Sequence, residues 1–139
     1  MAVVTEHINI NTKGKADIID ITDKVRSKLT RTKLKDGTVT IFVIGSTGGL
    51  TTIEYEPALV SDIKGLFDKL IPSNIQYAHD ATWGDANGHS HLRASLLGPS
   101  LTVPFSGNEL TLGTWQQIIF IDFDNRSRSR KVVLQFIGE

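Results

Sequence analysis

The sequence predicts a single α+β domain in which antiparallel sheets are covered by two main helices. Segments rich in apolar and β-branched residues recur at strand-like lengths, with turn signals between them. Only two longer segments carry an apolar stripe at helical spacing. The 139 residues suffice for one core and leave no room for a second, so we expect one compact domain over residues 1–139.

Strands account for most of the predicted elements. The segment Thr38–Ile44 is apolar and β-branched almost throughout, which predicts a central strand buried on both faces. Turn signals rich in Gly, Asn and Asp bound the other expected strands, which are Val3–Ile10, Leu50–Tyr55, Leu101–Phe105, Leu110–Leu112, Trp115–Phe123 and Lys131–Ile137.

Helices are predicted at three places. The first begins near Asp20 or Thr22, either of which is a candidate cap. Its apolar residues recur four apart, at Ile21, Val25 and Leu29. The second opens at Pro57, which suits a first helical turn, and ends before Pro72. A short third helix is expected over His91–Leu97.

Composition and charge exclude several classes of protein. Fifteen basic and fifteen acidic residues balance, whereas a nucleic-acid-binding protein needs a cationic surplus. No cysteine is present, so disulfides, thiolate zinc sites and thiol nucleophiles are excluded. The chain opens without a signal-peptide pattern, and its longest apolar run, Ile118–Ile121, is far too short for a membrane span. We therefore expect a cytoplasmic protein with no nucleic-acid or membrane partner.

A polar stretch over Ser73–Ser90 is the strongest sign of a functional site. A loop of this length in a compact domain is usually functional or disordered, and its histidine and aromatic content favours function. His79, His89 and His91 lie within thirteen positions, beside the candidate substrate-binding residues Asp85 and Asn87. On an extended segment, His-x-His would point both rings to one side, a geometry that can chelate zinc or a similar ion. The competing interpretation is that these rings hydrogen-bond substrate or backbone.

Three further groups leave alternatives open. Glu54 and Glu56 share a strand face and could act as acid and base, although a solvated face is preferred for the second. The segment Gly45–Gly49 could cradle an anion with its amides, or form a tight turn. The arginines at 126, 128 and 130 would project to one side and could contact phosphate, although such a run is more often a solvated edge.

Three blocks resemble the YjbQ-like family of small bacterial and archaeal proteins. They are Tyr77-Ala78-His79-Asp80, His91-Leu92-Arg93-Ala94-Ser95-Leu96-Leu97-Gly98 and Leu112-Gly113-Thr114-Trp115-Gln116. The resemblance covers nearly the whole chain. It implies a compact α+β homotrimer with a proposed secondary thiamine-phosphate synthase activity, which joins a pyrimidine diphosphate to a thiazole phosphate.

By position, the resemblance puts the family's polar pocket on Glu54, His79, His91, Ser95 and Gln116. One departure is that many family members have a histidine where this chain has Gly45. This chain has His89 instead, in a different loop, so either the third imidazole has moved or the site chemistry differs.

The leading hypothesis is an enzyme acting on a small phosphorylated metabolite, with thiamine phosphate synthesis as its most specific form. His79, His91 and Glu54 are the candidate catalytic residues. The candidate substrate-binding residues are Ser46, Thr47, Asp85, Asn87, Ser95 and Gln116. The candidate ligands for a divalent metal, zinc or magnesium, are His79, His89 and His91. The alternative is a homotrimer that binds a metal or metabolite without catalysis.

Overall fold

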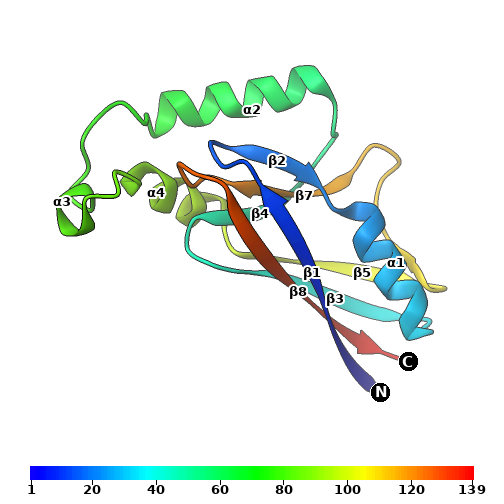
Figure 1. The fold of residues 1–139 in the computed structure, drawn as a ribbon. Coiled ribbons are helices and arrows are strands. Elements are labelled where there is room, and N and C mark those ends of the chain that lie inside the picture. The colour runs from blue at the N-terminus through cyan, green and yellow to red at the C-terminus, as the bar shows by residue number, and fades with distance from the viewer.

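The protein, represented by a computed structural model that describes residues 1–139, forms two antiparallel sheets and four helices (Figure 1). The predicted α+β class is confirmed. The five-stranded sheet has the spatial order β1-β8-β3-β5-β6, with β1 Ala2–Thr12, β8 Arg128–Gly138, β3 Gly37–Ile44, β5 Ser100–Ser106 and β6 Glu109–Leu110. The three-stranded sheet has the order β2-β7-β4, with β2 Asp17–Asp20, β7 Gln117–Asp122 and β4 Gly48–Ile53. The helices are α1 Thr22–Thr32, α2 Pro57–Leu70, α3 Asp80–Trp83 and α4 Gly88–Leu97.

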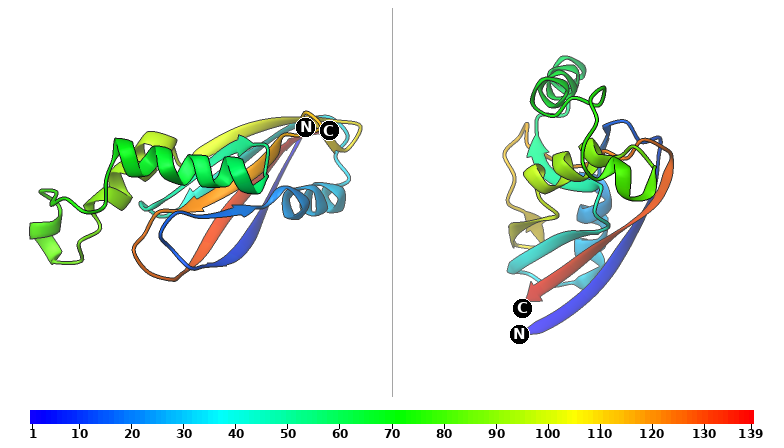
Figure 2. Two further views of the ribbon diagram at one scale, coloured as in Figure 1. Left: turned by 90° about the horizontal axis from the view of Figure 1, so that it is seen from above. Right: turned by 90° about the vertical axis from the view of Figure 1, so that its left-hand side faces the viewer.

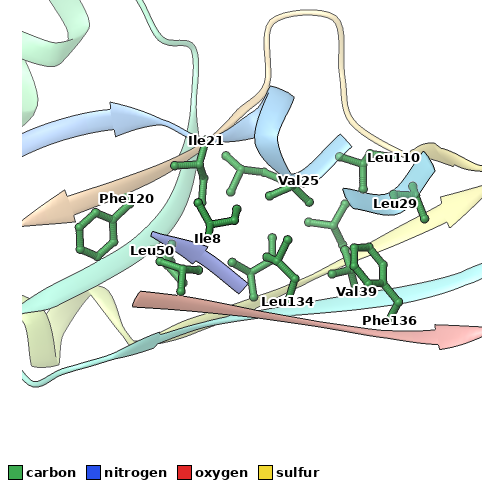
Figure 3. Packing of buried hydrophobic residues seen from close by; sticks show 14 of the residues in the cluster. Ile8, Ile21, Val25, Leu29, Val39, Leu50, Leu110, Phe120, Leu134 and Phe136 are labelled. Atoms are coloured by element: carbon green, nitrogen blue, oxygen red, sulfur yellow. The ribbon is translucent and has the colours of Figure 1, made fainter. Parts of the chain in front are cut away.

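Two hydrophobic clusters hold these layers together. The larger lies between the two sheets and α1, and includes Ile8, Leu29, Leu50 and Phe136 (Figure 3). The smaller joins the other face of the three-stranded sheet to α2 and α4, through apolar residues such as Phe67. The views in Figure 2 show α2 and α4 on the side of the three-stranded sheet away from β1 and β8. The three-stranded sheet is therefore covered on both faces.

The covered sheet changes the interpretation of the apolar run in β7. Ile118–Ile121 are at most 1% exposed, because β7 is the middle strand of that sheet. By contrast, β3 is central in the five-stranded sheet but has only one buried face, so the prediction of burial on both faces was wrong. Phe42 is 44% exposed and Ile44 51% exposed on the outer face of this sheet. No helix covers that face, and alternate residues therefore meet solvent.

The two main helices lie close to their predicted positions. Asp20 accepts hydrogen bonds from the backbone N–H and the hydroxyl of Thr22 at the start of α1. Glu56 accepts from the N–H groups of Ala58 and Leu59, so this carboxylate caps α2. The short strand β2 was not predicted, since its four residues lie directly against the start of α1.

The stretch expected as one long loop contains two helices. Four residues form α3, and α4 begins three residues before the predicted start at His91. The His-x-His pair consequently lies on a helix and not on an extended segment. Residues two apart on a helix are about 200° apart around its axis, so the rings of His89 and His91 leave α4 on different sides. None of the helices is long and apolar enough to cross a membrane.

Candidate functional site

A polar cavity of about 370 Å³ gathers most of the residues with chemical potential. We call it the first cavity. It lies where the β3–β4 turn, the segment around α3, the start of α4, and the β7–β8 turn come together. Its lining residues are Gly45, Ser46, Thr47, His79, Trp83, Asp85, Asn87, His91, Asp124, Arg128 and Arg130. Only one of these is apolar, so the cavity is built for a polar ligand.

Two imidazoles face each other in the first cavity. The ring centroids of His79 and His91 are 4.4 Å apart and the ring planes are inclined by 56°. Burial lowers the pKa of His91, and the nearby His79 lowers it further, while Asp124 and Asp85 act in the opposite direction. His91 is therefore mostly neutral at pH 7 and has a nitrogen lone pair available to accept a proton.

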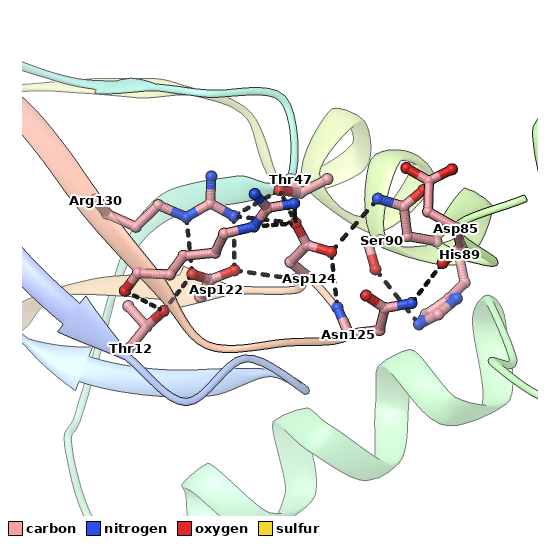
Figure 4. A network of polar contacts seen from close by, with 11 residues as sticks. Thr12, Thr47, Asp85, His89, Ser90, Asp122, Asp124, Asn125 and Arg130 are labelled. Carbon is pink, nitrogen blue, oxygen red and sulfur yellow. Dashed lines mark hydrogen bonds and ion pairs between the residues drawn. The ribbon is translucent and has the colours of Figure 1, made fainter. Parts of the chain in front are cut away.

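A buried ion pair with Asp122 fixes Arg130, which lines the first cavity (Figure 4). Arg130 Nε donates to Oδ2 of Asp122 at 2.8 Å, and Nη2 donates to Oδ1 at 2.8 Å. Nη2 also donates to the hydroxyl of Thr47 at 2.5 Å, and the hydroxyl of Thr12 donates to Asp122. The hydrogen bonds from Arg130 to Asp122 raise the pKa of the guanidinium, although burial opposes them. This arginine is held in one orientation.

A second pair lies closer to the histidines. Arg128 Nε and Nη2 lie 2.8 and 2.7 Å from Oδ2 of Asp124. Burial acts to raise the pKa of Asp124, but hydrogen bonds from the Asn125 N–H, Arg128 and Asn87 outweigh it and the pKa is lowered. Asp124 is therefore ionised at neutral pH, and each arginine has one engaged edge and one terminal nitrogen, Nη1, without a hydrogen bond in the structure.

Gly45 has a backbone conformation that brings it against Arg130. Its φ is +151°, and a Cβ built there would lie 2.8 Å from Arg130 Nη1. The resemblance to YjbQ-like proteins leads us to expect a histidine at this position in many relatives. Here the guanidinium of Arg130, on β8, lies in the space that a side chain at Gly45 would enter.

Asn87 presents an unsatisfied acceptor. The residue is only 4% exposed, and its Nδ2 donates to Asp124 at 3.4 Å. Its Oδ1 is buried and has no hydrogen-bond partner. A buried amide oxygen left unpaired costs free energy.

The structure brings six of the predicted site residues together and separates four others. The residues in the first cavity are Ser46, Thr47, His79, Asp85, Asn87 and His91. Ser95 lies one turn along α4, where its hydroxyl donates to the carbonyl of His91, and it lines a small neighbouring hollow. His89 lines a different cavity, described below.

Glu54 and Gln116 lie at the opposite end of the three-stranded sheet. Gly48 pairs with Asp122 beside the first cavity, whereas Ile53 pairs with Gln117 at the far end of β4. Five residue steps of about 3.3 Å separate these ends by roughly 17 Å. The Gln116 side chain instead bonds Thr52 and the Gly113 N–H, away from the histidines.

The predicted three-histidine metal set is not assembled. Only His79 and His91 meet, because the helical geometry of α4 turns His89 away. No group of three or more His, Asp or Glu side chains in the structure is arranged to hold a metal ion. Glu54 does not join the histidines either, because it lies at the opposite end of the three-stranded sheet.

Sequence reasoning missed the two aspartates that hold the arginines. Asp122 and Asp124 follow the apolar run of β7 at a spacing of two, and Arg128 and Arg130 have the same spacing on β8. Paired carboxylates and guanidiniums at period two on consecutive strands are the signal that could have found them. Trp83, which is 79% exposed at the rim of the cavity, carried no comparable signal.

Known proteins resemble this chain over nearly its whole length. A family profile described as "UPF0047 protein YjbQ-like" matches residues 6–139. A UPF0047 protein of Methanothermobacter thermautotrophicus is 35% identical over 139 residues, covering 100% of this chain and 95% of that protein. One from Archaeoglobus fulgidus is 38% identical over 128 residues, covering 92% of this chain and 97% of that protein.

Solved structures agree with this sequence comparison. The crystal structure of a YbjQ-like protein of unknown function from Sulfolobus solfataricus P2 has a TM-score of 0.94 at 29% identity, covering 99% of each chain. A hypothetical protein from Aeropyrum pernix K1 has a TM-score of 0.91 at 31% identity, covering 98% of this chain and 99% of that one.

Proposed function

We propose that this chain, which belongs to the UPF0047 YjbQ-like family, is an enzyme acting on a small phosphorylated metabolite bound in the first cavity. The observation that carries the proposal is the convergence of two imidazoles and two oriented guanidiniums on one polar cavity. Guanidiniums suit phosphate oxygens, and imidazoles suit proton transfer near neutral pH.

Each group in the cavity has a role that its geometry supports. The free Nη1 atoms of Arg128 and Arg130 would donate to phosphate oxygens, since the other edges are held by Asp124 and Asp122. His91 would accept a proton from the reacting group or return one to a leaving oxygen.

The charge balance of the cavity bears on the protonation state of the complex. Arg128 and Arg130 face the three carboxylates of Asp85, Asp122 and Asp124, so the site has no surplus of positive charge when both histidines are neutral. A phosphate dianion would therefore favour a protonated imidazole beside it. We expect such a ligand to bind more tightly at pH 6 than at pH 8.

The most specific form of the proposal is thiamine phosphate synthesis, which comes from the family resemblance alone. In that reaction the thiazole nitrogen attacks the pyrimidine methylene carbon, and diphosphate departs with the electrons of the broken C–O bond. In this chain the two arginines would neutralise the departing diphosphate. A divalent ion would normally assist, and the cavity has no acidic cluster to hold one without the substrate.

Turnover assays test the enzyme proposal. Purified protein with a pyrimidine diphosphate, a thiazole phosphate and magnesium should form thiamine phosphate, and a panel of phosphate esters should reveal any other turnover. His91→Ala, and His79→Ala at the ring that faces it, should each lower the rate by about 10²–10⁴-fold if the imidazoles take part in proton transfer. His7→Ala, an exposed histidine on β1, is the matched control and should leave the rate unchanged. Equal rates in wild type and His91→Ala would overturn the proposal.

A second candidate is a binding protein without catalysis, for a metabolite or a metal. The pre-oriented arginines favour recognition whether or not a reaction follows. A metabolite present at a hundred times its Kd would add about 2.7 kcal/mol to the stability, which a thermal-shift screen detects. Tight binding without turnover would favour this candidate. Elemental analysis of protein purified without a His-tag, and of His91→Ala, tests the metal form.

We further propose that the chain assembles as a cytoplasmic homotrimer. The apolar surface available for assembly is not β7, which is buried, but the outer face of the five-stranded sheet. Its exposed apolar residues are Val3, Phe42, Ile44 and Ile137. Sedimentation at micromolar concentration that returned only a 15.3 kDa species would contradict the trimer.

A further inference from the structure

A second polar cavity, of about 510 Å³, lies on the other side of α4 from the first. It is lined by Lys15, Ala16, Lys64, Asp68, Ser73, Ala86, His89, Arg93 and Asn125. We propose that this second cavity is a binding site for a small anion with phosphate or carboxylate groups, separate from the first cavity. The proposal does not depend on the proposed function, since the two cavities have no lining residue in common.

The charge of the second cavity favours an anion. Three of its side chains are cationic and one is acidic, whereas the charged residues of the first cavity balance. Lys15 and Lys64 take part in none of the ion pairs of the structure. The single acid, Asp68, is 70% exposed and contacts only Arg93, at 3.2 Å. Two ammonium groups are therefore left to meet a ligand.

Arg93 gives the cavity a fixed donor. Its side chain is only 5% exposed, and its Nε donates to the carbonyl of Ile71 at 2.9 Å. Nη2 contacts Asp68, and Nη1 forms no hydrogen bond in the structure. A buried guanidinium with an unused nitrogen is oriented before a ligand arrives, which lowers the entropy cost of binding.

The backbone around the cavity adopts unusual conformations. The chain has five non-glycine residues with positive φ, and three of them line this cavity: Lys15 at 57°, Ala16 at 61° and Ala86 at 52°. Such conformations are unfavourable for side chains with a Cβ, and they persist only where surrounding contacts impose them. One such contact is the hydrogen bond from the Lys15 N–H to the carbonyl of Asp124 at 2.6 Å. This contact fixes the Lys15 backbone at the edge of the cavity.

Protonation of His89 would make the affinity for an anion depend on pH. Burial lowers the pKa of His89 and the charge of Arg93 lowers it further, while Asp80 and Asp124 act in the opposite direction. Lys15 from the β1–β2 turn and Lys64 with Asp68 from α2 also line this cavity. An anion bound among these groups would favour the protonated ring. Affinity should therefore increase as pH falls from 8 to 6.

The volume sets the size of the ligand. A cavity of about 510 Å³ falls within the range of roughly 300–1,000 Å³ typical of small-molecule sites. Inorganic phosphate, pyrophosphate and citrate are suitable probes. All three carry anionic oxygens, but the first two are phosphates and the third is a carboxylate, so their comparison shows which class of anion the cavity binds.

An NMR titration of ¹⁵N-labelled full-length protein with these three probes tests the proposal. The amide signals of Lys15, Ala16 and Asn125 should shift on addition of at least one probe, and more strongly at pH 6 than at pH 8. The double variant Lys15→Gly/Lys64→Gln should weaken this binding at least tenfold. Glycine suits the positive φ at position 15, so the charge is removed without added strain.

Lys69→Gln, on α2 but outside the cavity, is the matched control and should bind like the wild type. Lys64→Gln alone provides a second variant if the double variant is poorly folded, and it should weaken binding severalfold. Shifts confined to Ser46 and Thr47 would overturn the proposal, as would no shift at 20 mM probe, or equal affinity in the wild type and the lysine variants. None of these readouts depends on turnover at the first cavity.

Discussion

The two cavities on either side of α4 differ in how their cationic side chains are held. In the first, the guanidiniums of Arg128 and Arg130 are held by buried carboxylates. In the second, Lys15 and Lys64 are unpaired, and only Arg93 is fixed. Arginines paired with buried carboxylates give a precise geometry at the cost of desolvating charged groups, whereas exposed lysines cost little and leave the geometry loose. The first arrangement suits chemistry and the second suits simple binding.

The difference originates in two short segments that both cavities use. On α4, His91 faces the first cavity while His89 and Arg93 face the second. In the turn after β7, Asp124 lines the first cavity and Asn125 the second. The amide of Asn125 also donates to the carbonyl of Asp85 at 2.7 Å, which ties the two sides together. One helix and one turn therefore divide their polar groups between two sites.

The largest expected effect comes from breaking the buried ion pair. Asp122 is fully buried, so Asp122→Ala would leave Arg130 charged and without its main partner. We expect a loss of about 3–5 kcal/mol in the free energy of unfolding, measured by urea denaturation. The matched change in the second cavity is Asp68→Ala, which removes an exposed partner of Arg93 and should cost about 0–1 kcal/mol. Similar losses in the two variants would show that the cavities do not differ in this way.

A smaller effect is expected at Gly45. Gly45→Ala places a Cβ 2.8 Å from Arg130 Nη1 at a φ of +151°, where side chains with a Cβ are strained. The cost should be about 1–3 kcal/mol in the free energy of unfolding. Gly84→Ala is a useful control, because its φ is also positive at 75° but nothing lies within 4 Å of the added Cβ. If both variants lose the same stability, the contact with Arg130 has no energetic weight.

The sequence predicted the fold better than the site. Strong periodic signals located β1, β3, β8, α1 and α2 because local apolar patterns determine them. Burial of β3 on one face could not be predicted, since it depends on the absence of a helix packed over the outer face. Likewise, His89 was grouped with His79 because the segment lacks an apolar period and was interpreted as extended. Whether two polar residues meet there depends on a helix that tertiary packing stabilises.

The site residues from distant segments show the same limit. His79 and His91 were found because they are close in sequence and chemically distinctive. Asp122 and Asp124 were not selected, because an aspartate next to a strand is equally typical of a turn. Their partners lie eight positions further on for Asp122 and four for Asp124, across the β7–β8 turn. The strands β7 and β8 belong to different sheets, so only the packing of the two sheets brings carboxylate and guanidinium together.

A moderate effect should appear as a dependence of stability on pH. The pKa values of His89 and His91 are both lowered, chiefly by burial, so the folded protein binds fewer protons than the unfolded chain near pH 6. Stability should be fully present above pH 6.5, the unperturbed histidine value, and decline as the pH falls below it. Asp80 and Asp124 also have lowered pKa values, but they act below about pH 4.

Urea denaturation at pH 7.5 and pH 5.5 measures this dependence. The wild type should be less stable at pH 5.5, and the difference should shrink in His89→Gln and in His91→Gln. Comparison of the two variants shows which cavity contributes more to the pH dependence. Unchanged stability between the two pH values in the wild type would contradict the direction assigned to both groups.

The smallest effect on stability is expected at Trp83. Its indole is 79% exposed at the rim of the first cavity, so Trp83→Ala removes little buried surface and should change the free energy of unfolding by less than about 0.5 kcal/mol. An exposed aromatic face at the rim of a cavity that two arginines also line suits stacking on a flat ring, and loss of such a contact costs about 1 kcal/mol of binding. A metabolite with both a phosphate and an aromatic ring should therefore bind Trp83→Ala roughly fivefold or more weakly, whereas inorganic phosphate should bind it like the wild type. Quenching of tryptophan fluorescence measures the affinity. Trp115→Ala is the matched control, because it removes an indole that is 71% exposed and lies away from both cavities. If ring-bearing ligands bind both variants equally well, then the ring of the ligand does not stack at the rim, and recognition in the first cavity depends on its polar groups alone.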